Sequence, residues 1–106
     1  MDEFELILRY FVRADEGEGV VTGIGDDGAV LRAGPGRELV TVVDTLVEGT
    51  HFPGDMSAAD LGYRAVAVNL SDIAAMASRP LWMTLALTMP CCNLWRFSSN
   101  QIHELQ

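Results

Sequence analysis

The sequence has few cysteines, few basic residues and no long apolar run, and each shortage excludes a class of protein. Its two cysteines, Cys91 and Cys92, are adjacent, so they form neither a C-x-x-C redox motif nor a zinc-binding pair and cannot link distant segments. This cysteine usage favours a reducing, cytoplasmic compartment. The longest weakly polar stretch, residues 65–77, is interrupted by polar side chains, and the acidic start MDEFE lacks the basic region of a secretory signal. We therefore expect no membrane partner.

The charge balance excludes a further class. Seven basic against fifteen acidic residues give a net charge of −8, and without a basic patch this charge repels nucleic acid and anionic lipid. We expect no nucleic-acid partner. An acidic chain can still bind a phosphorylated ligand when divalent cations lie between its carboxylates and the phosphates. With 49% hydrophobic and 21% charged residues over 106 positions, the composition is that of one globular domain.

Periodic apolar residues predict two helices. In the first, residues 3–13, an apolar stripe expected to lie in the core is spaced i, i+3, i+4, i+7 and consists of Phe4, Ile7, Leu8 and Phe11. In the second, residues 60–78, the stripe expected to be buried consists of Val66, Leu70, Ile73 and Ala77. Either Ser57 or Asp60 is suited to cap this second helix. Residues 93–106 form a weaker helix candidate.

Short β-branched and apolar runs predict the strands. An extended segment begins at residues 20–21, a short strand follows at 29–32, and LVTVV at 39–43 has the composition of a strand covered on both faces. The run LWMTLALTM at 81–89 predicts another strand. Together the elements predict an α+β (α/β) fold, with a small mixed sheet and flanking helices.

The stretch TGIGDDGAVL, residues 22–31, satisfies the G-x-G-x-x-G spacing of a dinucleotide-binding loop. That motif requires a helix after its last glycine, whereas here a short apolar run and a Gly-Pro-Gly turn follow, so we reject it. Asp26 and Asp27 would also repel a bare pyrophosphate. They instead offer hard oxygen ligands on a backbone that glycine lets bend sharply, which suits magnesium. The alternative is a plain turn, because Asp and Gly are common turn residues.

Two further carboxylates occupy positions where an unpaired charge is unfavourable. Asp44 directly follows the predicted strand 39–43, at the end where open sheets place their ligand sites. Asp72 lies, with Asn69, on a helix flank otherwise made of Gly62, Ala65 and Met76. Such a carboxylate must be hydrogen-bonded, paired with a base or bound to a metal. The alternative to a metal is a structural pair with Arg64 or with a loop amide.

The segment DTLVEGTHF, residues 44–52, places Glu48 and His51 shortly after the same strand end. His51 is a candidate for substrate contact. The alternative is a histidine that is simply exposed or locally hydrogen-bonded.

Taken together, three stretches carry a family resemblance: GIGDDGAVL, VTVVDTLVEGTHF and ADLGYRAVAVNLSDIAAMASRPLWMTLALTMP. In this order and spacing they resemble the N-terminal part of the thiamine-monophosphate kinase family, within the aminoimidazole ribonucleotide synthetase superfamily. The resemblance runs from about Phe4 to Pro90, and NLSDIAAM is its most specific part. It implies the N-terminal domain of that fold over residues 1–90, followed by an unassigned tail at 91–106.

The resemblance also implies a chemistry: phosphorylation of thiamine monophosphate by ATP, with Mg²⁺ ions bridging carboxylates and nucleotide phosphates. By position, Asp27, Asp44 and Asp72 match the magnesium-binding aspartates of the family, and Asp26 is a weaker candidate beside them. His51 matches a residue that lines the thiamine phosphate site. No residue is implied as a covalent or acid–base catalyst, because the protein in phosphoryl transfer mainly positions groups and offsets charge.

Three departures from the family pattern limit what the resemblance implies. The two positions before Asp44 commonly hold Ser or Thr, but here they are Val42 and Val43, so only a backbone carbonyl, that of Val43, remains for a metal. The tail CCNLWRFSSNQIHELQ keeps only a loose helical likeness. The second domain of the family, with further ATP and substrate contacts, is absent, and we expect this chain to be inactive alone.

Two other functions fit the same residues. One is a different superfamily member acting on a purine intermediate or on selenide, although EGTHF and NLSDIAAM favour the thiamine enzyme. The other is a module that only dimerises, because the N-terminal domains of the superfamily pair through their sheets, and exposed strands make such pairing reasonable. LWMTLALTM would then be an interface strand of a homodimer.

Overall fold

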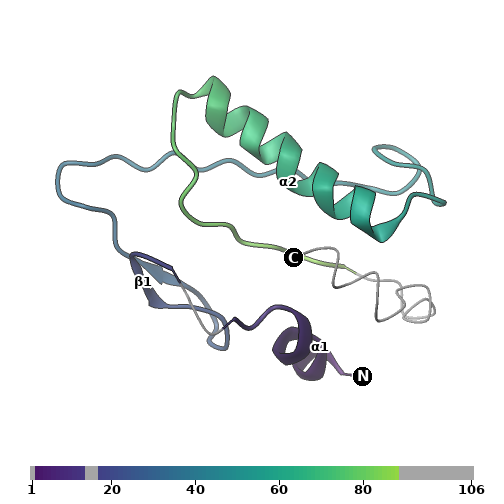
Figure 1. The fold of residues 1–106 in the computed structure, drawn as a ribbon, viewed down its shortest axis with the longest axis horizontal. Helices are drawn as coiled ribbons and strands as arrows, with labels where there is room; N and C mark the ends of the chain where they lie inside the picture. Colours follow the sequence, from purple (N-terminus) through teal and green to yellow (C-terminus); the bar gives the residue numbers. More distant parts are fainter. Residues whose placement is uncertain (1, 14–16, 89–106) are drawn as a thin grey trace. The chain divides into compact units, whose positions relative to one another are not determined.

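The structure, a computed structural model, describes residues 2–13 and 17–88, which contain two helices and one small sheet (Figure 1). Along the chain the elements are α1 (Glu3–Tyr10), β1 (Val20–Thr22), β2 (Val30–Leu31) and α2 (Ala58–Ala75). The chain divides into two units, Met1–Leu39 and Val40–Gln106. The predicted combination of helices with a small sheet is confirmed, although in the described residues the sheet is an antiparallel pair and not a mixed sheet.

Helix α1 begins where its own first turn supplies hydrogen bonds to the backbone. Asp2 Oδ1 accepts from the Glu5 N–H at 2.8 Å, and Glu5 Oε2 accepts from the Asp2 N–H at 3.1 Å, which together form a capping box. At the other end the Arg9 guanidinium lies 5.4 Å from the centre of the Tyr10 ring. The helix predicted over residues 3–13 is therefore present, but it ends three residues early, at Tyr10.

Strands β1 and β2 form a hairpin around the GDD loop. Val20 pairs with Leu31 and Thr22 with Val30, with an irregularity in β1 between these two pairs. Beyond the strands, the Arg32 N–H donates to the Gly19 carbonyl at 2.7 Å. No helix follows Gly28, so the structure confirms the sequence argument against a dinucleotide-binding loop.

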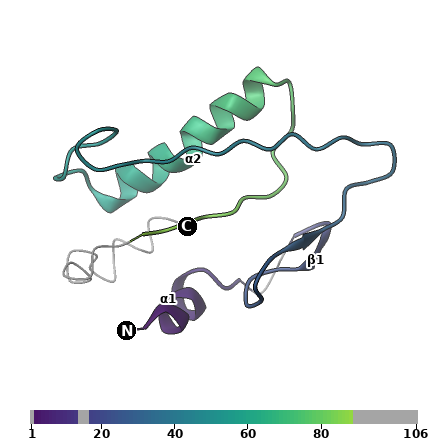
Figure 2. The same ribbon diagram turned by 180° about the vertical axis from the view of Figure 1, so that it is seen from behind.

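Helix α2 is the long helix of the second unit (Figure 2). Ser57 is its N-cap: the Ser57 Oγ accepts from the Asp60 N–H at 3.1 Å and donates to Asp60 Oδ2 at 2.7 Å. This settles the choice between Ser57 and Asp60. At the far end Ala77 has a φ of 51°, a left-handed conformation, and the Ser78 N–H donates to the Ile73 carbonyl at 3.0 Å.

Two predicted strands are not formed. Residues 39–43 and 81–88 belong to no strand in the structure, and they run as extended chain before and after α2 (Figure 1). A strand exists only when a neighbour supplies its ladder of hydrogen bonds, and the described residues contain no such neighbour for either segment. Residue 89 and the predicted helix at 93–106 lie outside the described residues.

The predicted apolar stripes are not buried either. Phe4 and Leu8 of α1 are 74% and 67% exposed, while Val66 and Leu70 of α2 are also exposed. Within the described residues, the buried apolar side chains are Tyr10 and Ala58 alone. The periodicity places these side chains on one face of each helix, but burial of that face requires a second element packed against it. Among the helices described, none is long and apolar enough to cross a membrane.

Candidate functional site

The GDD loop presents one engaged and one unengaged carboxylate. Gly25 has a φ of 115°, which a side chain would strain, so the turn before the two aspartates depends on glycine. Asp26 Oδ1 accepts from the Asp27 N–H at 2.8 Å. The Asp27 carboxylate is exposed and has no hydrogen bond or ion pair in the described part of the chain. Asp27 is thus the more available ligand of the pair.

Asp44 and Asp72 are exposed carboxylates of the second unit. Asp44 lies in the extended segment after Val43, whose side chain is 88% exposed, and Asp72 lies in the last turn of α2. Across residues 17–88 neither carboxylate has a hydrogen bond or ion pair, so the structural pair between Asp72 and Arg64 is not formed. Asn69, on the same flank as Asp72, donates instead to the Ala65 carbonyl at 2.9 Å.

The chemistry of this donor set fits Mg²⁺, because the ion prefers carboxylate and carbonyl oxygens and usually keeps several waters. The structure does not assemble the set. Among the residues that it describes, no three His, Cys, Asp or Glu side chains gather into a group that could hold a metal ion. Asp26 and Asp27 belong to the first unit, whereas Val43, Asp44 and Asp72 belong to the second. Metal binding by these residues stays a prediction.

His51 lies in a turn that closes on itself. Its ring Nδ1 accepts from the Val47 N–H at 2.9 Å, and its backbone N–H donates to the Val47 carbonyl at 2.8 Å. The Gly49 N–H donates to the Phe52 carbonyl at 2.8 Å, with Gly49 at a φ of 80°. The local hydrogen bonding that the sequence left open as an alternative is therefore present. It uses one ring nitrogen, so the other is still available to a ligand.

Arg64 lies near this turn, although the sequence indicated it only as a possible partner of Asp72. It extends from α2, and its Nη1 donates to the His51 carbonyl at 2.7 Å, across thirteen positions in the sequence. Nothing in the spacing of an Arg and a loop carbonyl predicts such a bond, because every backbone carbonyl is an equally good acceptor. The bond joins the turn of residues 47–52 to the helix.

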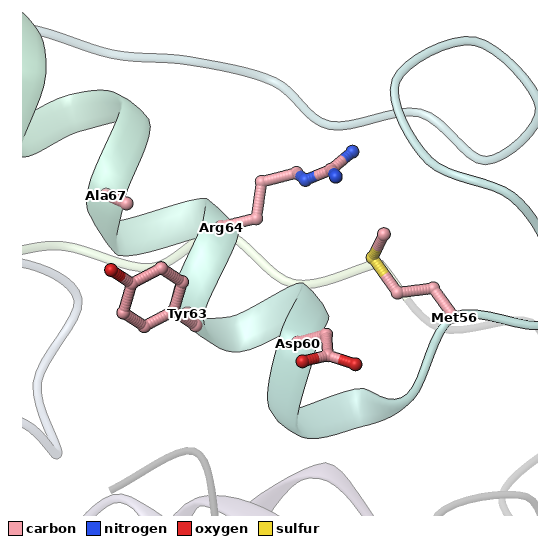
Figure 3. A pocket seen from close by; sticks show the side chains of 5 residues that line it. All are labelled: Met56, Asp60, Tyr63, Arg64 and Ala67. Carbon is pink, nitrogen blue, oxygen red and sulfur yellow. The ribbon is translucent and has the colours of Figure 1, made fainter.

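A shallow pocket lies beside this bond, at the N-terminal half of α2. Figure 3 shows Tyr63 and Arg64 leaving the helix in different directions, with the Asp60 carboxylate and the Met56 side chain nearby. Ala67 completes the lining. The pocket combines an acidic, a basic and an aromatic side chain, and four of its five residues lie in the stretch beginning ADLGYRAVAV that carries part of the family resemblance.

Comparison with known proteins identifies the family. Residues 25–104 match the family described as AIR synthase related protein, N-terminal domain, and the chain belongs to this family. Its curated relatives are named thiamine-monophosphate kinase. That of Salmonella typhimurium is 54% identical over 89 residues, which is 83% of this chain and 27% of the relative. That of Buchnera aphidicola subsp. Acyrthosiphon pisum is 49% identical over 102 residues, 92% of this chain and 32% of the relative.

The match with Haemophilus influenzae thiamine-monophosphate kinase covers 100% of this chain and 34% of the relative, at 43% identity. The resemblance first inferred from the GDD, EGTHF and NLSDIAAM stretches is confirmed by these relatives. The chain spans about a third of the length of the curated relatives it matches. For this chain, the activity of its full-length relatives is therefore a proposal.

Proposed function

We propose that this chain is the N-terminal part of an ATP- and magnesium-dependent kinase that converts thiamine monophosphate to thiamine diphosphate. The observation that carries the proposal is its identity of 43–54% with thiamine-monophosphate kinases over most of its length. In this reaction an oxygen of the substrate phosphate bonds to the γ-phosphorus of ATP, the β–γ phosphoanhydride bond breaks, and ADP leaves. The cytoplasm, where ATP is supplied, is the location that we propose.

Within that reaction, Asp27, Asp44 and Asp72 are the proposed magnesium ligands, with the Val43 carbonyl and Asp26 as further donors. Their support is chemical: all three carboxylates are exposed and, in the described residues, have no protein partner that would compete with a cation. Bound Mg²⁺ would offset the charge on the nucleotide phosphates. The carboxylates themselves would fix where the cation sits, and no covalent enzyme intermediate forms.

His51 is the proposed contact to thiamine monophosphate. The turn of residues 47–52 holds its ring through Nδ1 and leaves Nε2 to an external acceptor, such as a phosphate oxygen. Because the chain spans about a third of its relatives, we propose that further substrate contacts come from outside it and that it is inactive alone. Assay of the pure 106-residue chain should show no thiamine diphosphate above a no-protein control. Measurable turnover would contradict the inactivity.

Calorimetric titration tests the magnesium ligands. Mg²⁺ with a non-hydrolysable ATP analogue is titrated into the chain, into Asp72→Asn and into Asp55→Asn, an exposed control that loses the same charge outside the proposed ligand set. We expect binding that requires Mg²⁺ and is weakened by Asp72→Asn alone. Equal weakening by both variants would reduce the effect to net charge and contradict the ligand role of Asp72. No binding by a folded chain would contradict assembly of the site within these residues.

A homodimer is a second proposal, which the extended run after α2 supports. Leu81, Met83, Leu85 and Leu87 alternate along the chain and are 47–70% exposed, so an extended backbone places four apolar side chains on one face. Exposed apolar strands of this kind are buried by pairing with another copy or another chain. Sedimentation equilibrium over a wide range of concentrations should therefore show a dimer, and a strict monomer would contradict it.

A further inference from the structure

The turn of residues 47–52 fixes which ring nitrogen of His51 carries the proton. Nδ1 accepts a hydrogen bond from the Val47 N–H, so in the neutral ring the proton is on Nε2. The backbone N–H of the same residue donates to the Val47 carbonyl, and thus Val47 holds His51 at both the ring and the main chain. With the side chain exposed, Nε2–H is a donor available to a ligand.

The turn is anchored outside itself by the bond from Arg64 Nη1 to the His51 carbonyl, which comes from within α2. A helix is a stiffer support than a loop, because its backbone hydrogen bonds are made internally. Arg64 therefore ties the turn to the most regular element of the second unit.

From this geometry we propose that Arg64 is a positioning residue, which holds the His51 turn on α2 and so keeps the Nε2–H of His51 presented to an acceptor oxygen. The functional part of this inference rests on the proposed function, in which that oxygen belongs to the phosphate of thiamine monophosphate. The positioning part does not, because it concerns the free chain. Arg64 acts through the carbonyl of His51, not by touching the substrate.

The test is the ¹⁵N NMR signature of the His51 ring, which separates the two neutral tautomers. Spectra are recorded at a pH where free imidazole is neutral, and the second histidine, His103, is identified with a His103→Gln variant. Arg64→Met keeps a long side chain but removes every hydrogen-bond donor, whereas Arg64→Lys keeps one charged donor group. Arg79→Met is the control, because it loses the same charge beyond the end of α2.

In the unmodified chain we expect a protonated Nε2 and an unprotonated Nδ1. Arg64→Met should move both resonances towards the average of mixed tautomers, Arg64→Lys should restore them in part, and Arg79→Met should leave them unchanged. Amide spectra of α2 check that each variant stays folded. Unchanged ring shifts in a folded Arg64→Met chain would overturn the proposal, because the turn would then hold His51 without α2.

Addition of thiamine monophosphate separates this inference from the proposed function. We expect the His51 Nε2–H resonance to shift on titration, with a dissociation constant raised on the order of tenfold by Arg64→Met. If the unmodified chain shows no shift, His51 does not contact the substrate in this chain, and that part of the proposed function fails. The tautomer result still decides the role of Arg64. A shift with equal affinity in both chains would overturn the link from Arg64 to binding.

Discussion

Helix α2 and the extended run of residues 81–88 that follows it are close in sequence, yet only the helix is formed as a regular element. The backbone hydrogen bonds of the helix are made within the helix itself. In its first turn, the Asp60 N–H has no helical acceptor and donates to Ser57 Oγ instead. The run 81–88 is a largely apolar segment of strand length, but a strand's hydrogen bonds come from another chain segment. Both elements were thus predicted from the sequence, but only the helix is formed.

The difference shows that an element forms here when its hydrogen bonds are local. The capping box of α1, the β1–β2 hairpin and the cap of α2 each join residues close in sequence. The segments 39–43 and 81–88 need partners from farther away, and their apolar side chains are left largely exposed. A partner segment should convert residues 39–43 and 81–88 into strands, whereas removal of one local bond should weaken only the element that contains it.

The largest expected effect is on the proposed homodimer. Leu85→Lys places a charge in the middle of the apolar face formed by alternate residues 81–87, and a buried Leu contributes enough that association should weaken roughly 10- to 100-fold. Thr84→Lys adds the same charge on the opposite face of an extended chain. Sedimentation equilibrium of both variants should show dissociation for Leu85→Lys alone. Equal loss in both would indicate a charge effect and not an apolar interface.

A medium effect is expected when the cap of α2 is removed. Ser57→Ala deletes the oxygen that accepts from the Asp60 N–H, and such caps are worth about 1 kcal/mol. Amide hydrogen exchange in the first turn of α2 should become faster accordingly. Ser71→Ala, an exposed serine inside the same helix, is the control, and it should slow exchange slightly because Ala is the better helix former. Slower exchange in Ser57→Ala would contradict the local origin of the helix.

The sequence predicted those parts of the fold that local chemistry decides. Residues 3–13 and 60–78 were recognised as helices by their 3.6-residue period, and three of their four observed ends differ by two or three residues. The segments beginning at 20–21 and spanning 29–32 were predicted to be extended, and the structure pairs them as β1 and β2. Strands 39–43 and 81–89 were predicted from composition alone, which says that a segment is suited to pairing but not that a partner is near. The predicted burial of Phe4 and Leu70 is wrong for the same reason.

The site divides in the same way. The sequence selected Asp27 by its glycine-bearing loop, Asp44 by the predicted strand end and Asp72 by its helix flank, and in the structure all three are exposed. Whether they meet at one cation depends on contacts between distant segments, which composition does not encode. Arg64 was named only as a possible partner of Asp72, and its actual partner was missed because that partner is a backbone carbonyl, a group that every residue carries. His51 was identified, but its bond to Val47 required the actual path of the turn.

The smallest expected effect concerns the C-terminal end of α2, where one residue has a backbone conformation that its side chain disfavours. Ala77 has a φ of 51°, in the left-handed region that glycine adopts without cost, and the Ser78 N–H that follows it bonds the Ile73 carbonyl. Ala77→Gly should therefore stabilise this helix end by about 0.5 kcal/mol, after the greater entropy of the unfolded glycine is deducted. The measurement is hydrogen exchange at the Ser78 amide, which should slow about twofold.

Ala74→Gly, the same change inside the helix, should instead speed exchange by an amount equivalent to about 1 kcal/mol. Opposite signs for two identical substitutions three residues apart would show that local backbone geometry, and not the loss of a methyl group, governs this element. Equal signs would mean that α2 ends elsewhere than at Ala75 in solution.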